Sequence, residues 1–317
     1  MWIPLLVLVG LLYLYRRYRH GLILENLTDK YVFITGCDSG FGNLLARNLD
    51  KRGMRVLAAC LTEKGAENLK KETSSRLSTV ILDVTKTQSV KEAVKWASAI
   101  VGDKGVWGLV NNAGISVPSS ATEWMTKEDF FKTIDVNIMG VVDVTIHLLP
   151  LIRKARGRVV NVSSIAGRLT VCPGGYCISK YGVETFSDNL RREMKPFGVK
   201  VSIIEPGFFN TQITSKELLR KCSEDCWNRT SEEVKKSYGE NFFQQCVGSL
   251  DKLPAMCNKD LSLVTNCMEH ALTAMYPWTR YAVGWDSKLI YLPLSYLPTV
   301  VSDYILTIGQ PRPAEAI

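Results

Sequence analysis

The stretch "KYVFITGCDSGFG", residues 30–42, joins a short apolar run to a turn with three glycines. The run is rich in β-branched and aromatic residues, so it predicts a strand over residues 30–35. Gly36, Gly40 and Gly42 allow a tight turn that brings backbone amides close to an anion at the start of the next helix. The spacing GxxxGxG is a weak indication alone, because such turns also occur for packing reasons.

The alternation of strand and helix continues from this stretch along the chain. Apolar runs predict further strands, and the segments between them predict helices, over these ranges: strands 54–60, 78–84, 106–112, 157–164 and 199–207; helices 42–51, 87–101, 127–152 and 176–194. Near-continuous apolar strands separated by helices indicate an α/β fold, a doubly wound parallel sheet in a single domain. Ligands of such sheets bind beyond the carboxyl ends of the strands.

Polar and small residues follow these strands, where a ligand is expected. Asp83 ends the third strand and could accept from an adenine amino group or cap a helix. The run "NNAG", residues 111–114, ends the fourth strand with a small-residue turn. Ser163 and Ser164 end the fifth strand, about a dozen residues before Tyr176.

The stretch "GGYCISKYG", residues 174–182, places Tyr176 one helical turn before Lys180. A cation beside a phenol favours phenolate and lowers a pKa that is ordinarily about 10. The pair is therefore a candidate acid/base group, although a tyrosine and a lysine at this spacing are also common on helix surfaces.

Composition excludes several classes of protein. The formal net charge is +8, but no nucleic-acid-binding motif accompanies it, and the basic cluster Arg16, Arg17 and Arg19 adjoins an apolar segment. Nine scattered cysteines without CxxC pairs indicate reduced thiols, and three isolated histidines make a metal site improbable.

Both ends of the chain are apolar. Residues 1–20 predict an uncleaved membrane anchor whose basic flank places the following domain in the cytosol; the alternative is a buried first helix of the core. Residues 286–317 predict an apolar tail that lies on a membrane or packs on the core.

The motifs together resemble the short-chain dehydrogenase/reductase superfamily over residues 29–285: TGxxxGxG, NNAG, Asn137 in "DVNIMG", the serine pair, YxxxK and "PGFFNT". Longer stretches, including "DKYVFITGCDSGFGNLLAR" and "GGYCISKYGVE", are similar to its membrane-bound retinol dehydrogenase and 3α-hydroxysteroid dehydrogenase branch.

The resemblance implies a Rossmann-type fold and a role for each matching residue. Tyr176 is the catalytic acid/base, Lys180 binds the nicotinamide ribose and lowers the tyrosine pKa, Ser164 (with Ser163 as the alternative) holds the reacting oxygen, and Asn137 supports a proton relay. Cofactor contacts are implied for Thr35, Gly36, Ser39, Gly40, Phe41, Gly42, Asp83, Asn111, Ala113, Gly114, Tyr176, Lys180, Pro206, Gly207 and Thr211.

The expected cofactor is NAD, with NADP as an alternative. Asp38 occupies a glycine-turn position where NADP enzymes often carry a base, and Lys64 comes only after Glu63. The usual ribose-binding acid at the end of the second strand is absent, since Cys60 and Leu61 stand there.

The resemblance implies oxidation of a lipophilic alcohol, retinol or a 3α-hydroxysteroid, at the endoplasmic reticulum (microsomal) membrane. Residues 212–275 are expected to form a lid over the substrate. The alternatives are an NADPH-dependent reductase of retinal or ketosteroids and a dinucleotide-fold binding protein without turnover. A homo-oligomer is compatible with either enzyme.

Overall fold

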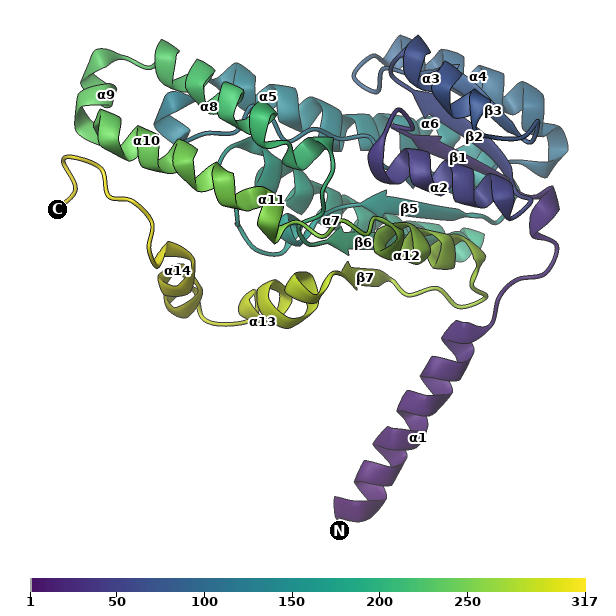
Figure 1. Cartoon of the computed structure of the whole chain (residues 1–317). Helices are drawn as coiled ribbons and strands as arrows, with labels where there is room; N and C mark the ends of the chain where they lie inside the picture. Colours follow the sequence, from purple (N-terminus) through teal and green to yellow (C-terminus); the bar gives the residue numbers. More distant parts are fainter. Residues whose placement is uncertain (1) are drawn as a thin grey trace.

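The structure, a computed structural model, describes residues 2–317 and contains one seven-stranded parallel sheet (Figure 1). The strand order is β3-β2-β1-β4-β5-β6-β7. The strands are β1 (Tyr31–Thr35), β2 (Arg55–Cys60), β3 (Leu77–Ile81), β4 (Gly108–Asn111), β5 (Arg158–Val162), β6 (Lys200–Pro206) and β7 (Arg280–Val283). The order reverses between β1 and β4, so the predicted doubly wound α/β fold is confirmed.

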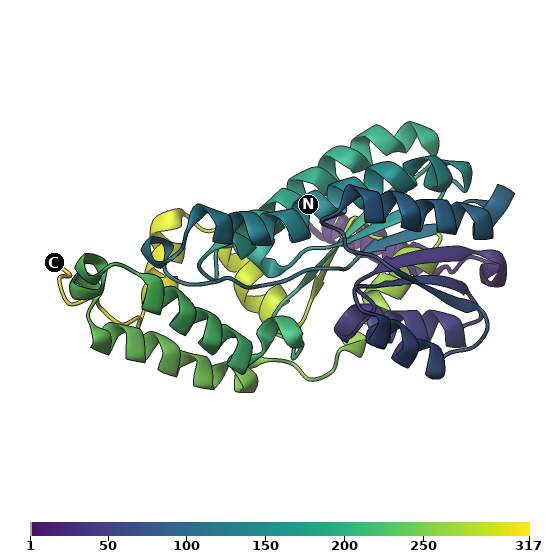
Figure 2. The same ribbon diagram turned by 90° about the horizontal axis from the view of Figure 1, so that it is seen from above.

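Helices cover both faces of the sheet, with teal and blue helices on one side and dark blue helices on the other (Figure 2). One face packs against α2 (Gly40–Lys51), α3 (Glu63–Lys71) and α12 (Ser262–Thr273). The other packs against α4 (Thr87–Val101), α6 (Gly140–Lys154) and α7 (Gly175–Met194). Because the strands are buried on both faces, they read as continuous apolar runs rather than alternating ones.

Two core elements differ from the expectation. β7 was not predicted, because four residues at a sheet edge give little periodic signal. Helix α12 falls inside residues 212–275, the range expected to form the lid. It instead contributes Val264, Met268 and Leu272 to the core beside the sheet. The helices that extend from the sheet in this region are α8 (Lys216–Arg229), α9 (Glu232–Tyr238), α10 (Glu240–Ser249) and α11 (Leu253–Met256).

The helix expected over residues 127–152 is continuous but irregular. It comprises α5 (Lys127–Ile134), a π-helical turn over Asp135–Met139, and α6. Among residues 2–317, Lys127–Lys154 is the helix long and apolar enough to cross a membrane. Its α6 part supplies Val144, Leu148 and Ile152 to the core, so it acts as a core helix of the sheet.

Helix α1 (Trp2–Gly21) stands away from the domain, and its described side chains are largely exposed (Figure 1). A buried first helix of the core is therefore not what the structure contains. The base of α1 is nevertheless fixed: the His20 ring stacks on Trp278 at 3.7 Å, and His270 Nε2 lies 2.7 Å from the His20 carbonyl oxygen.

The C-terminal segment follows β7 and includes α13 (Leu292–Leu294) and α14 (Thr299–Thr307). Leu294 is buried, whereas Leu289, Val300 and Tyr304 are 70% exposed or more. Most of the apolar surface of this tail therefore faces outward.

Candidate active site

The turn between β1 and α2 passes directly beside the turn that follows β4. Gly36 has φ +69°, and a Cβ there would lie 2.8 Å from the Ala113 Cα atom. Glycine is therefore required for the backbone angle and for the close approach. The approach places the N-terminus of α2 at the carboxyl end of the central strands, where its dipole favours an anion.

Side chains lock these two turns together. The Thr35 hydroxyl accepts from the backbone amides of Asn112 and Ala113, each at 3.0 Å. In return, Asn112 Nδ2 donates to the carbonyl oxygens of Thr35 and Gly36, also at 3.0 Å. The geometry of the glycine turn is thus set by the strand beside it.

A cleft of about 710 Å³ opens where the strands end. This volume is ample for a cofactor and part of a substrate. The following predicted residues line it: Gly36, Ser39, Gly40, Phe41, Asp83, Ala113, Gly114, Ser164, Tyr176, Lys180, Pro206, Gly207 and Thr211. Ser163, the alternative to Ser164, lines it as well.

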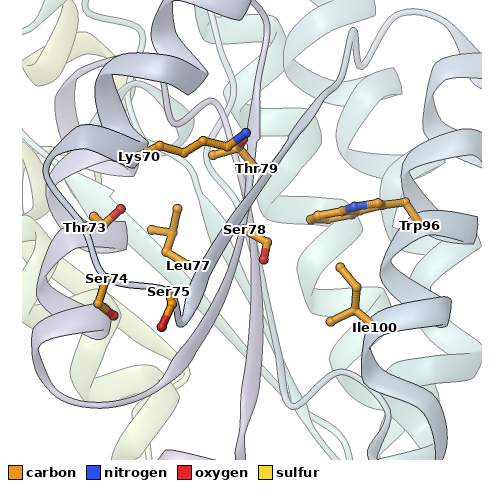
Figure 3. A pocket seen from close by; sticks show the side chains of 9 residues that line it. All are labelled: Lys70, Thr73, Ser74, Ser75, Leu77, Ser78, Thr79, Trp96 and Ile100. Atoms are coloured by element: carbon orange, nitrogen blue, oxygen red, sulfur yellow. The ribbon is translucent and has the colours of Figure 1, made fainter.

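A second hollow of about 400 Å³ lies at the outer edge of the sheet between α3, β3 and α4 (Figure 3). Lys70, Ser78, Trp96 and Ile100 line it, and none belongs to a motif noted above. The chemistry-bearing residues therefore belong to the larger cleft.

Ser164, Tyr176 and Lys180 meet at the floor of that cleft. Lys180 Nζ lies 5.6 Å from the centroid of the Tyr176 ring and donates to the Val162 carbonyl oxygen at 2.8 Å. The Ser164 hydroxyl accepts from the Ala166 amide at 3.1 Å. Strand β5 and helix α7 thus present a hydroxyl, a phenol and an ammonium to one space.

Burial controls the protonation of this group. It raises the pKa of the Tyr176 phenol, and negative charge on Cys172 would raise it further, whereas the Ser164 hydroxyl acts in the opposite direction. Burial also lowers the pKa of the Lys180 ammonium to about 8, although the Glu184 carboxylate opposes this shift. An additional positive charge in the cleft would lower the pKa of Tyr176 and so favour its phenolate form.

Asn137 lies behind the group, in the π-helical turn. Its Oδ1 accepts from the Ile115 amide at 2.8 Å, and its Nδ2 donates to the Ile115 carbonyl and to the Ser179 hydroxyl. Such π-turns are frequent at functional sites, because they aim a side chain that a regular helix would place elsewhere. Asn137 does not line the cleft itself, but a Cβ on Gly114 would lie 3.2 Å from its Oδ1 and 3.8 Å from Lys180 Nζ.

Comparison with known proteins agrees with this geometry. The family model described as "short chain dehydrogenase" matches residues 30–221. The chain belongs to the short-chain dehydrogenase family. It is thus an oxidoreductase that binds NAD or NADP, and a glycine turn with no space for a Cβ at a helix N-terminus fits the pyrophosphate of such a cofactor.

Relatives match this short-chain dehydrogenase over its whole length. Retinol dehydrogenase 16 of Homo sapiens is 61% identical over 317 residues, which is 100% of both chains. The 17-beta-hydroxysteroid dehydrogenase type 6 of Homo sapiens is 54% identical over the same length, again 100% of both. A solved short-chain dehydrogenase from Streptomyces avermitilis is 26% identical with a TM-score of 0.69, covering 88% of this chain and 96% of that one.

Three residues implied as cofactor contacts do not line the cleft of this short-chain dehydrogenase. Asn111 is buried, and its Nδ2 donates to Thr145 and Asn161 on the core side of β4. Gly42 is needed for packing, since a Cβ there would lie 2.4 Å from the Gly36 carbonyl oxygen. Thr35 contributes indirectly, because its hydroxyl holds the turn after β4 against the glycine turn through the hydrogen bonds described above. The prediction missed Asn112, which lines the cleft; the second asparagine of NNAG was the available signal.

Two further predicted residues combine cleft and local roles. Asp83 lines the cleft, but its Oδ1 accepts from the Thr85 hydroxyl at 2.6 Å and its Oδ2 pairs with Lys86. These local contacts agree with the alternative interpretation, in which Asp83 caps the next helix. Thr211 also lines the cleft, and its backbone amide donates to Thr214 Oγ1 at 3.0 Å as part of a capping box at the start of the next turn.

A network of charged side chains in this dehydrogenase lies next to the turn of α7 that follows Lys180. Arg280 on β7 pairs with Glu184, with Glu205 at 2.9 Å and with Asp188 at 2.7 Å. Burial raises the pKa of Glu184 to about 7, and the Glu205 carboxylate adds to the shift while Arg280 opposes it. One Glu184 oxygen, Oε1, has no hydrogen-bond partner among the described residues.

The network extends to the C-terminal tail. Arg168 pairs with Glu205 at 3.1 Å and donates to the Tyr296 hydroxyl at 2.8 Å. A contact in the tail is thus connected through three charged residues, Arg168, Glu205 and Arg280, to the helix that carries Tyr176.

Proposed function

We propose that this protein is a membrane-bound dehydrogenase that oxidises the hydroxyl of a lipophilic alcohol, retinol or a 3α-hydroxysteroid, and uses NAD. The observation that carries the proposal is identity of 54–61% over the full length with relatives named for retinol and hydroxysteroid substrates. The convergence of Ser164, Tyr176 and Lys180 on one cleft supports it.

Each residue of the group has a role in this reaction. Tyr176, as phenolate, takes the proton of the alcohol, and Lys180 stabilises the phenolate and binds the ribose. Ser164 donates to the oxygen of the alcohol as it becomes a carbonyl. Asn137 holds the turn beside Gly114 and links the site to a proton relay. The nicotinamide dinucleotide supplies the hydride acceptor.

The position of Asp38 favours NAD over NADP. Its Oδ2 accepts from the Leu61 amide at 2.7 Å, and its Oδ1 accepts from the Thr62 amide and hydroxyl at 2.9 and 2.7 Å. The carboxylate thus lies at the end of β2, where a 2′-phosphate would be recognised. Like charges repel there, although Lys64 also lines the cleft.

A buried aromatic cluster joins the helices between β6 and α12 to the rest of the domain. Trp227 on α8 lies 4.7 Å from Trp124 and stacks on Phe243 of α10 at 4.9 Å, measured between ring centroids. We infer that α8–α11 form the lid and that this aromatic cluster holds it in place. Substrate choice between retinoid and steroid would then depend on the lid surface that faces the cleft.

The ends of the chain support attachment to the endoplasmic reticulum membrane. Helix α1 exposes Leu6, Leu11 and Leu14, at 59% or more, to its surroundings, and the tail exposes further apolar side chains. Arg16, Arg17 and Arg19 at the domain side of α1 favour a catalytic domain in the cytosol. Under this proposal residues 1–20 are the anchor and residues 286–317 a membrane-associated tail.

The test is an assay of full-length protein in membranes with retinol and with an androstane-type 3α-alcohol, each with NAD and NADP. We expect NAD-dependent turnover of at least one alcohol, abolished in Tyr176→Phe. Absence of turnover on both alcohols would reject the substrate proposal, and a preference for NADP would reject the cofactor proposal.

A further inference from the structure

Two thiols lie against each other directly beside Tyr176. Cys172 Sγ and Cys177 Sγ are 3.4 Å apart, and Cys177 Sγ also donates to the Cys172 carbonyl oxygen at 3.2 Å. Both cysteines are free. Cys177 is next to Tyr176 in the first turn of α7, and Cys172 lies in the loop that leads into this helix, residues 169–174.

The two thiols differ in access and in acidity. Cys172 is partly exposed, whereas Cys177 is 3% exposed. Hydrogen bonding by Cys172 lowers the pKa of Cys177, and Cys177 in turn raises the pKa of Cys172. An external reagent can therefore reach Cys172, and the neighbouring Cys177 sulfur is the better thiolate for a second, internal step.

The loop that holds Cys172 connects Tyr176 with the lid. The Ser119 hydroxyl donates to the Pro173 carbonyl oxygen at 3.0 Å, and the Ser119 amide donates to Cys222 Sγ on α8 at 3.4 Å. A movement of Cys172 is thus transmitted both to the lid and to the turn before Tyr176.

We propose that Cys172 and Cys177 form a reversible disulfide that lowers turnover, a modification site built around the acid/base tyrosine. The effect on turnover rests on the proposed function, whereas formation of the bond does not. The two thiols share a proton across their contact, and when it lies on Cys177 the Cys172 thiolate attacks a small disulfide such as glutathione disulfide, forming a mixed disulfide and releasing one glutathione thiol. The Cys177 thiolate then attacks the Cys172 sulfur, the protein disulfide forms, and the second glutathione leaves as a thiol. The two cysteines are oxidised and one glutathione disulfide is reduced.

The geometry predicts how the bond acts. Sulfur atoms in a disulfide are about 2 Å apart, so the two Sγ atoms, now 3.4 Å apart, must approach each other by about 1.4 Å. Cys177 is fixed in α7, so the loop at Cys172 has to move, and it pulls on the Ser119 contacts to the lid. A displacement of this size near reacting groups can lower turnover by about 10²-fold, and we expect a loss of about tenfold or more. No residue from 169 to 174 lines the dinucleotide cleft, so cofactor binding should stay unchanged.

A thiol outside the lid offers a matched control. Cys267 is a free, partly exposed cysteine on the core helix α12, and it does not line the cleft. Cys267→Ser therefore removes a thiol without touching the proposed bond or the Ser119 contacts, and Cys172→Ser removes the bond while leaving Cys177 beside Tyr176.

The experiment treats full-length protein in detergent with glutathione disulfide at pH about 8, then measures alcohol oxidation, dinucleotide binding and the disulfide map by mass spectrometry without reduction. We expect a Cys172–Cys177 cross-linked peptide, a loss of turnover that dithiothreitol reverses, and unchanged dinucleotide affinity. Cys267→Ser should respond like the unmodified protein, and Cys172→Ser should keep its turnover under oxidation.

Three outcomes would overturn the proposal: no cross-linked peptide, full turnover with the bond formed, or equal inactivation of Cys172→Ser. If the reduced protein oxidises neither alcohol, the proposed function fails, and the peptide map still decides whether the bond forms.

Discussion

Replacing Glu184 by glutamine should shift the pH dependence of catalysis, because Glu184 lies one turn from Lys180 on α7 and favours its charged form. Glutamine keeps the size of the side chain and its ability to accept from Arg280, but it removes the negative charge. At about 6 Å and an effective dielectric constant of about 20, that charge is worth about 3 kcal/mol to the ammonium. Arg280 already offsets part of it, so we expect the pKa of Lys180 to fall by about one unit.

The direction of the change follows from the role of Lys180. Turnover requires the ammonium, and its pKa of about 8 should appear as an alkaline limb in the profile of kcat/KM. In Glu184→Gln this limb should move about one unit lower. The measurement follows formation of the reduced dinucleotide from the lipophilic alcohol in detergent between pH about 6 and 10.

Glu193→Gln is the matched control, since Glu193 is an exposed acid on the same helix and binds Asn189. Its alkaline limb should coincide with that of the unmodified protein. An unmoved limb in Glu184→Gln, or equal shifts in both variants, would refute the electrostatic link between Glu184 and Lys180.

Further predictions concern the acid/base group, the cofactor and stability. Tyr176→Phe should lower turnover by about 10²–10⁴-fold while dinucleotide affinity, followed by fluorescence titration, stays the same; retained turnover would contradict the assigned role. Asp38→Asn should lower the NAD/NADP ratio of kcat/KM by about tenfold, and an unchanged ratio would remove Asp38 as a determinant. Arg280→Met should reduce the free energy of unfolding by about 3–5 kcal/mol in urea titrations, because it leaves the buried Glu184 carboxylate without its ion-pair partner; a loss below about 1 kcal/mol would show that the network is not stabilising. Because the folded pKa of Glu184 is about 7, above the ordinary value of 4.5, its contribution to stability is full below pH 4.5 and is lost as pH rises through 7. Unfolding at a series of pH values should show this fall, and it should vanish in Glu184→Gln.

The sequence predicted the sheet well because a doubly wound fold buries each central strand on both faces. The runs at 30–35 and 54–60 match β1 and β2 to within one residue at each end. At the edge of the sheet the same rule weakens: β3 ends at Ile81, although the run continues to residue 84. The π-helical turn at 135–139 has no sequence signal of its own and depends on the side chains packed around Asn137.

Site residues could be predicted where a motif determines the backbone geometry. They could not be predicted where the role of a residue depends on the direction of its side chain. Gly36 and Gly40 could be assigned because their positive φ angles strongly favour glycine. Asn111 and Asn112 are identical in sequence terms, but strand alternation directs the first into the core and the second toward the cleft. The bonds from Asp38 to the amides after β2 could not be foreseen, because they depend on how two turns meet.

The two apolar ends of the chain leave the sheet at opposite ends of its strands. Helix α1 is held by Trp278, and the segment after it by Thr273, next to the beginnings of the last strands. The tail instead follows the end of β7, where Asp286 accepts from the Phe208 amide beside the cleft. If both ends rest in one bilayer, the strands must run along the lipid surface instead of upright on it. A lipophilic substrate would then pass from the bilayer to the cleft beneath the tail without crossing water. Helix α1 would attach the domain to the membrane at the opposite end of the strands.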